Sequence, residues 1–177
     1  MGSAKLLVLQ YHTKDQYATQ ASEGRVNDYK VKGFPTIILN GVKQVLGGSS
    51  GSYNQQTTAI EKEAAKGAAV TLSVPSSFSP ESAAGVTVTN VSGFDISNAK
   101  LMAVVYEDLG KDEHHYLVRE VLAPVVFSLP SGSSQNYEFT ARYQGKNLNL
   151  VVFIQAANGE VLQAAATDNP PAPVAAA

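Results

Sequence analysis

The segment 33–41 constrains the fold of this chain more than any other stretch. Residues 36–40 have a continuous apolar middle, which predicts a short strand buried on both faces. Pro35 has no N–H to donate at the entry to this strand, so it marks a turn, and the peptide bond before it is a candidate cis bond. Asn40-Gly41 predicts a tight hairpin turn into a second strand over residues 42–46.

The segments on either side of this hairpin predict the other elements of a small α/β unit. Residues 5–11 form an apolar run, which predicts a buried central strand. Residues 15–29 predict a connecting helical segment, although Gly24 makes one continuous helix unfavourable. A final helix is predicted over residues 53–66, with Ser52 as its N-cap.

From Ala69 onward the apolar period changes to two, which is typical of half-buried strands. Turn residues separate about seven strand candidates, and this pattern favours an antiparallel β-sandwich of immunoglobulin-like kind. The chain has neither Trp nor a Cys pair, so the pattern supports only a generic sandwich. The strand candidates are residues 70–74, 85–91, 101–106, 116–122, 137–143, 148–155 and 161–165.

The first third of the chain resembles the second half of a thioredoxin-like domain. The resemblance is carried by Val31-x-Gly33-Phe34-Pro35-Thr36, followed by a strand, Asn40-Gly41, a second strand and Gly47-Gly48, and it covers residues 5–66. In that family the proline is cis and lies beside a redox-active Cys-x-x-Cys motif. This chain has no cysteine, so the motif and the first β-α-β portion of such a fold are missing.

The predicted class is therefore an α+β fold with two domains. Residues 4–67 are predicted to form a partial thioredoxin-like domain, residues 69–167 an immunoglobulin-like β-sandwich, and residues 168–177 a Pro/Ala-rich tail or linker. This order is similar to a bacterial outer-membrane-protein family that joins the two parts, which implies an extracytoplasmic place: periplasm, outer membrane or cell surface. The residues that carry this second resemblance are Tyr11-His12 with Asp15, Arg25-x-x-x-Tyr29, 151–155 and 160–163.

Composition and charge exclude several classes of function. The net charge of −2 gives no electrostatic case for nucleic acid or an anionic membrane, and no apolar run is long enough to span a bilayer. The absence of cysteine excludes disulfides, thiol nucleophiles and Cys-bound metals within this sequence. The opening Met1-Gly2-Ser3 resembles an expression start, so we expect the native chain to begin upstream.

The chain offers few residues for catalysis or cofactor binding, and we predict no catalytic, cofactor or metal residue. His114-His115 with Asp112 and Glu113 is a metal-ligand cluster by residue type, but neighbours on a strand point to opposite faces, so a polar hairpin end is the favoured interpretation. The sequon at Asn90 is interpreted as a chance match. Cross-strand packing is favoured over a carbohydrate-stacking face for Tyr106, Tyr116, Tyr137 and Tyr143.

The candidate site is a peptide groove at Phe34, Pro35 and Thr36. In a complete thioredoxin-like fold this proline lines a groove that receives an extended peptide by strand addition. The resemblance therefore implies a non-catalytic, extracytoplasmic binding or structural module with a redox-inactive unit, which has a protein or peptide partner and uses no cofactor.

Two further expectations follow from the missing portion. The alternative function is a thiol-disulfide oxidoreductase whose Cys-x-x-Cys lies about 20 to 35 residues upstream of Ala4. Loss of the neighbouring strand would expose an apolar edge from Leu6 to Leu9, and we expect self-association to cover this edge strand.

Overall fold

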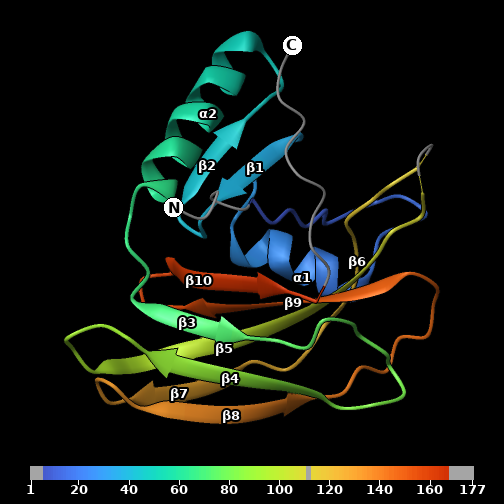
Figure 1. Cartoon of the computed structure of the whole chain (residues 1–177). Helices are drawn as coiled ribbons and strands as arrows, with labels where there is room; N and C mark the ends of the chain where they lie inside the picture. Colours follow the sequence, from blue (N-terminus) through green and yellow to red (C-terminus); the bar gives the residue numbers. More distant parts are fainter. Residues whose placement is uncertain (1–5, 111–112, 168–177) are drawn as a thin grey trace.

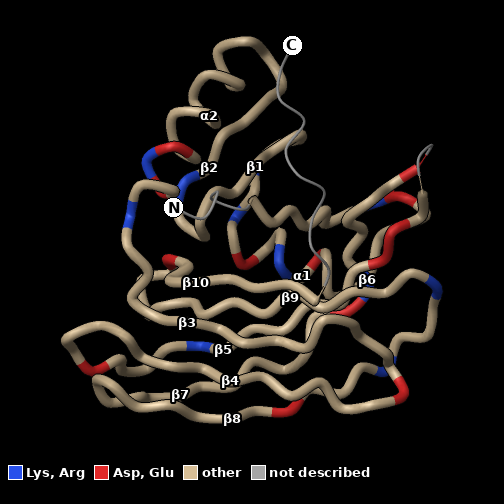
Figure 2. Tube along the Cα trace, viewed as in Figure 1, with Lys and Arg blue, Asp and Glu red and all other residues tan. Residues whose placement is uncertain are grey.

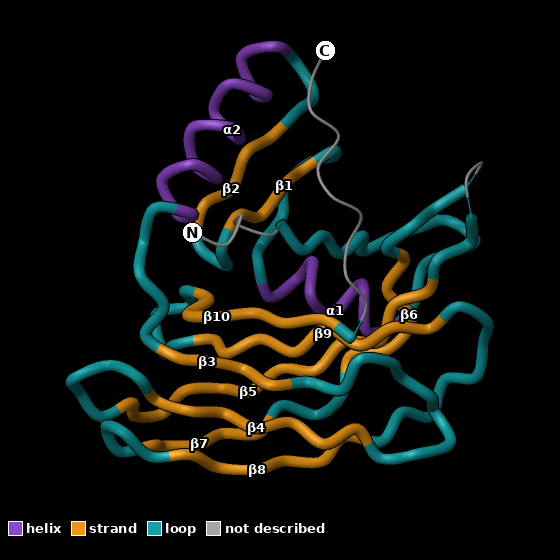
Figure 3. The backbone as a smooth tube through the Cα atoms, viewed as in Figure 1, coloured by secondary structure: helices purple, strands orange, loops and turns teal. Residues whose placement is uncertain are grey.

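Over residues 6–110 and 113–167, which the computed structural model describes, the fold is mostly β, with two helices and three small sheets of two, three and five strands. The two larger sheets lie face to face, and the two-stranded sheet stands above them in the view, together with the longer helix (Figures 1 and 3). The predicted class, an α+β fold that combines a partial thioredoxin-like α/β unit with an immunoglobulin-like sandwich, is therefore wrong.

The described residues form two α-helices and ten β-strands. The predicted tail, residues 168–177, lies outside those residues. No helix in the described part is long and apolar enough to cross a membrane. The bounds are α1 Gln20–Asp28, β1 Thr36–Leu39, β2 Lys43–Leu46, α2 Ser50–Ala64, β3 Val70–Ser73, β4 Ala84–Asn90, β5 Ile96–Glu107, β6 Leu117–Val121, β7 Val125–Leu129, β8 Ser134–Phe139, β9 Leu148–Gln155 and β10 Val161–Ala166.

Strand β5 is the centre of the larger sheet. Strand β9 pairs with it from Lys100 to Glu107, and β6 and β7 share its other side. Strand β10 continues the sheet beyond β9, while β3, β4 and β8 form the facing sheet. All of these neighbours pair in the antiparallel sense.

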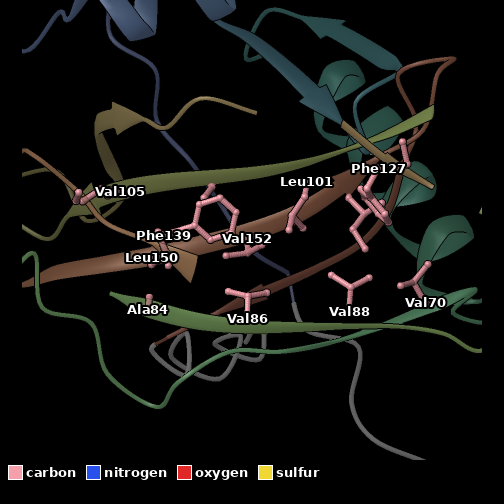
Figure 4. Packing of buried hydrophobic residues seen from close by; sticks show 14 of the residues in the cluster. Val70, Ala84, Val86, Val88, Leu101, Val105, Phe127, Phe139, Leu150 and Val152 are labelled. Atoms are coloured by element: carbon pink, nitrogen blue, oxygen red, sulfur yellow. The ribbon is translucent and has the colours of Figure 1, made fainter. Parts of the chain in front are cut away.

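The main core lies between the two larger sheets (Figure 4). Strand β4 buries every second residue, and Val86 and Val88 are 1% and 0% exposed. From the facing sheet, Leu101 of β5 and Ile154 of β9 are completely buried. Burial of one such side chain stabilises a fold by about 1.5–3 kcal/mol, so this layer supplies most of the stability that packing can give.

The segment 6–11 does not form the predicted central strand or an edge strand at Leu6–Leu9. It makes an isolated parallel bridge from Gln10 to Leu117 of β6 and otherwise runs as irregular chain. Its alternate apolar residues Leu7, Leu9 and Tyr11 cover the outer face of the five-stranded sheet. The apolar run is thus explained by burial on another sheet, which an apolar pattern alone cannot distinguish from strand pairing. The residues beneath it are Met102, Val104, Tyr106, Val118, Val151 and Phe153.

The predicted hairpin is present as β1 and β2, with Thr36 opposite Leu46. Asn40 and Gly41 have φ of 49° and 77°, which is the backbone that a two-residue hairpin turn requires. Helix α2 packs against this hairpin, and its N-cap is Ser49 rather than the predicted Ser52. Ser52 lies inside the helix and donates from its hydroxyl to the Leu46 carbonyl, 3.2 Å away.

Helix α1 is shorter than the predicted helical segment. It begins after Thr19, whose side-chain oxygen accepts from the Ser22 N–H at 3.0 Å. It ends before Tyr29 and includes Gly24, so glycine does not interrupt it. It contacts β6 at the margin of the larger sheet and thereby lies between that sheet and the hairpin (Figure 1).

Candidate functional site

The three predicted groove residues lie together where the chain enters β1. The Phe34–Pro35 peptide bond is cis. The Phe34 side chain is 61% exposed, and Pro35 is exposed beside it. Thr36 is half-buried, and its hydroxyl donates to the Gly33 carbonyl at 2.6 Å. The carbonyl of Pro35 is already used by β2, since it accepts from the Gly47 N–H at 2.8 Å.

Strand β1 pairs on one side only among the described residues, because its sheet has two strands. Antiparallel strands alternate in the direction of their backbone groups. Pro35 and Ile37 direct theirs toward β2, so those of Thr36 and Ile38 face the open side. The described chain therefore presents an unpaired edge directly after Pro35, which is the backbone that strand addition uses.

The surroundings of this edge are apolar and basic. Ile37 is 39% exposed and Leu46 is 63% exposed, so the hairpin leaves apolar surface beside Phe34 uncovered. Residues 29–49 contain Lys30, Lys32 and Lys43 and no acidic residue. All three lysines are exposed. Figure 2 shows basic and acidic residues close to the end of the hairpin that faces the larger sheet.

The far end of the hairpin is docked on the larger sheet. The Asn40 carbonyl accepts from the Val161 N–H at 3.0 Å, which joins the β1–β2 turn to the β9–β10 turn. Gly41 lies so close to the second turn that an added Cβ would be 2.2 Å from the Gly159 carbonyl oxygen. Only glycine can occupy this contact without moving the backbone.

A polar cluster continues this junction beneath α1. The Arg25 guanidinium donates to the Tyr29 hydroxyl at 2.7 Å and lies over the Tyr29 ring. Gln155 donates to the Gly159 carbonyl at 2.7 Å and also reaches the Tyr29 hydroxyl at 3.4 Å. Burial raises the pKa of the nearby Tyr11 hydroxyl to about 12, against the opposing effect of Arg25, so Tyr11 stays neutral. Tyr11, Arg25, Tyr29 and Gln155, which are part of the second resemblance, thus lie together here, whereas His12 and Asp15 lie elsewhere.

An exposed ion-pair group closes the same junction. The Lys66 ammonium lies 2.7 Å from Glu63 Oε2 and 2.9 Å from Glu160 Oε1, so it joins the end of α2 to the β9–β10 turn. Glu63 Oε2 also accepts from the side-chain amide of Asn40 at 2.8 Å. Exposed pairs stabilise weakly on their own, and the value of this group is that it fixes the hairpin to the sheet.

We expect this group to make stability depend on pH at both extremes. The hydrogen bond from Lys66 lowers the pKa of Glu160 below 4.5, and the hydrogen bond to Glu63 raises the pKa of Lys66 above 10.5. The contribution of Glu160 is therefore present above its unfolded pKa and is lost as pH falls through the folded value. The contribution of Lys66 is full below its unfolded pKa and is lost as pH rises through the folded value.

Thermal denaturation of Glu160→Gln checks this sign. The substitution should lower Tm slightly at about pH 7 and should have a smaller effect at about pH 3, because the Glu160 carboxyl becomes protonated as pH falls through its folded pKa. Glu81→Gln is the matched control, since that exposed carboxylate has no ion-pair partner among the described residues. An equal change in Tm at both pH values would contradict the assignment.

The histidines do not form a metal site within the described residues, where no group of three or more suitable ligands is found. His12 and His114 stack edge to face at 4.3 Å, and Tyr17 packs against both. His12 pairs with Asp15 at 2.7 Å, whereas His115 pairs with Asp108 at 3.0 Å. The two neighbouring histidines therefore serve separate contacts; Asp112 lies outside the described residues.

The other sequence features have structural roles. Tyr106 and Tyr116 pack on the outer face of the larger sheet, while Tyr137 and Tyr143 pack against the main core. The four tyrosines therefore do not form one common face. Asn90 is 0% exposed, and its amide donates to the carbonyls of Phe94 and Leu129 at 2.8 and 3.0 Å. Its nitrogen is thus occupied, which explains the sequon as a buried hydrogen-bonding asparagine.

Sequence reasoning missed the buried ion pair of Glu107 and Arg119. The Arg119 Nε donates to Glu107 Oε2 at 2.7 Å. The Arg119 side chain is 16% exposed and the Glu107 side chain is 8% exposed. Glu107 also accepts from the Tyr143 hydroxyl at 3.1 Å and from the Lys146 N–H at 3.1 Å. Every oxygen of this carboxylate is satisfied, which is typical of a structural pair and not of a general base.

Comparison with known proteins supports the fold and gives no family. Scans against protein-family models and against curated proteins gave no match. Over 92% of this chain the backbone is similar to a structural-genomics protein from Agrobacterium tumefaciens, with 16% identity, a TM-score of 0.52 and 77% of that chain covered. At this identity the similarity concerns the fold alone.

Two enzyme structures show weaker similarity. The alkylpurine DNA glycosylase AlkC of Pseudomonas fluorescens is 18% identical with a TM-score of 0.35, over 64% of this chain and 38% of that one. A β-glucosidase from Listeria innocua is 15% identical with a TM-score of 0.32, over 56% of this chain and 16% of that one. Scores this low support no functional inference.

Proposed function

We propose that this chain is a non-catalytic binding module that receives an extended, acidic peptide segment along the open edge of β1. The observation that carries the proposal is the unpaired backbone of Thr36 and Ile38 beside the exposed Phe34 side chain. Every second residue of an added strand would form main-chain hydrogen bonds with β1 there, and side chains at alternate positions would supply specificity.

The chemistry of the peptide follows from the surface around the edge. Its apolar side chains would cover Phe34 and Ile37, which are 61% and 39% exposed. Its acidic side chains would face Lys30 and Lys32, in a segment that has no acid of its own. Opposite charge across the interface favours acidic over basic peptides and raises the association rate.

The extracytoplasmic location and the upstream Cys-x-x-Cys of an oxidoreductase are supported by the sequence resemblance alone and stay predictions. Self-association also stays a prediction. The edge strand that motivated it, Leu6–Leu9, is not formed in the described residues.

A peptide titration followed by ¹H–¹⁵N NMR tests the proposal. The probe is acetyl-(Glu-Val)₃-amide, and the comparison peptides are its (Lys-Val)₃ counterpart and a version with alternate backbone nitrogens methylated. We expect the acidic peptide to shift the amides of Thr36 and Ile38, and both comparison peptides to bind at least about tenfold more weakly.

Two phenylalanine substitutions provide a test and its matched control. Phe34→Ala should weaken binding roughly fivefold or more, because it removes the apolar anchor beside the edge. Phe94→Ala should leave binding unchanged, since Phe94 is 82% exposed on a different loop. Equal effects of the two substitutions, or equal binding of the methylated peptide, would refute strand addition. A concentration-dependent dimer that protects Thr36 and Ile38 without peptide would assign the edge to a second copy.

A further inference from the structure

A hollow of ≈ 290 Å³ lies between α1 and the margin of the five-stranded sheet, apart from the β1 edge. One wall is apolar and is formed by Met102 of β5, Val121 of β6 and Pro124 after it. The opposite wall is the face of α1 that carries Gly24 and Arg25. Its volume is at the lower end of the range for small-molecule sites, roughly 300–1,000 Å³, and suits a small ligand.

Arg25 enters this hollow as an incompletely bonded cation. Its side chain is 12% exposed, and its Nε is buried with no hydrogen-bond partner among the described residues. One terminal nitrogen donates to Tyr29, and the other lies 3.6 Å from the carboxylate of Asp28, which is itself 66% exposed. The buried Nε is out of reach of a ligand, but the two terminal nitrogens carry four N–H groups, of which Tyr29 takes one, so Arg25 retains capacity to bind an anion.

A second cation and an amide lie on the sheet side of the same hollow. Lys100 of β5 lines it and is exposed, and no ion pair of the described residues engages Lys100. Gln155, which is paired with Lys100 across β5 and β9, lines it as well. Asp28 is the one acidic residue in the lining, so the ionised groups of the hollow sum to one positive charge.

We infer that the hollow binds a small monocarboxylate with a branched apolar body. The carboxylate would lie between Arg25 and Lys100, and the apolar body would contact Met102 and Pro124. Charge-assisted hydrogen bonds from a planar guanidinium suit a carboxylate. The Asp28 carboxylate disfavours a dianion such as a phosphate monoester through like-charge repulsion. This site is independent of the peptide edge proposed above.

Titration of the full chain with 4-methylpentanoate, followed by ¹H–¹⁵N NMR, tests the inference. The control ligand is 4-methylpentanamide, which has the same apolar body without the charge. The acid should give saturable shifts at Gly24, Met102 and Leu122, and the amide should bind about tenfold more weakly, since it lacks the charge-assisted bonds. Equal binding of both ligands, or shifts that do not saturate by about 50 mM, would overturn the inference.

Lys100→Gln tests the position of the carboxylate without altering the contacts of α1. It should weaken binding of the acid roughly fivefold and leave binding of the amide unchanged. Lys146→Gln is the matched control, because Lys146 is an exposed lysine whose N–H bonds to Glu107, at the other end of β5. If Lys100→Gln bound the acid as tightly as the Lys146→Gln protein, the assignment of the carboxylate position would be wrong.

Discussion

Glu107→Ala is expected to lower the free energy of unfolding by about 3–5 kcal/mol, because it leaves the Arg119 guanidinium buried without its counter-ion. The Arg119 Nε lies 2.7 Å from Glu107 Oε2, and the Arg119 side chain is only 16% exposed. The same change removes the acceptor of the Tyr143 hydroxyl and of the Lys146 N–H. Urea denaturation at neutral pH measures the loss.

The double variant Glu107→Met/Arg119→Met separates the buried charge from the lost packing. Replacing both partners of a buried ion pair with apolar residues is often neutral, so the double variant should be more stable than Glu107→Ala. The comparison with Glu107→Gln is informative as well, since the amide keeps an acceptor for Tyr143. If Glu107→Ala cost less than about 1 kcal/mol, the pair would contribute no more than an exposed one.

Gly41→Val is expected to detach the β1–β2 turn from the larger sheet at a cost of about 2–5 kcal/mol. Gly41 has φ of 77°, a conformation that disfavours a side chain by about 1–2 kcal/mol, and a Cβ would overlap the Gly159 carbonyl oxygen at 2.2 Å. Forced overlap adds roughly 1–3 kcal/mol. The hydrogen bond between Val161 and Asn40 should be lost first.

Native-state hydrogen exchange distinguishes this local effect from global unfolding. In Gly41→Val the amides of Val45 and Val161 should lose protection, while that of Leu101 in the main core should keep it. Gly48→Val is the matched control, because nothing lies within 4 Å of a Cβ placed there and Gly48 has no positive φ. Equal loss of protection at all three amides would show that residues 4–67 and 69–167 unfold as one unit, contrary to the predicted division into domains.

Local patterns predicted local elements well. Asn40-Gly41 placed the hairpin within one residue of each strand end, and the alternation in β4 identified the residues that face the core. The error of three residues at the start of α2 has a simple cause, since Ser49 and Ser52 are both suitable caps. Strand β7, Val125–Leu129, was missed because it is short and lies between Pro124 and Pro130.

Features that depend on distant partners could not be predicted. The apolar run of residues 6–11 fits a strand equally well, and only the outer face of β5, β6 and β9 shows what it covers. Arg119 meets Glu107 through a shifted register between β5 and β6, which no single-sequence pattern reveals. The open edge of β1 is likewise a property of the assembled sheets. The position of Phe34, Pro35 and Thr36 was predictable, but the absence of a described strand beside them was not.

The N-terminal apolar segment packs on a surface whose strands are synthesised much later. Leu7, Leu9 and Tyr11 leave the ribosome before the surface that they cover, because that surface includes Val151 and Phe153 of β9. β9 must also find β5 across more than forty residues before that surface exists, and pairing over such separations is slow. During synthesis these apolar residues therefore remain without the surface on which they pack, and this interval is when the newborn chain is most exposed to aggregation and most dependent on chaperones.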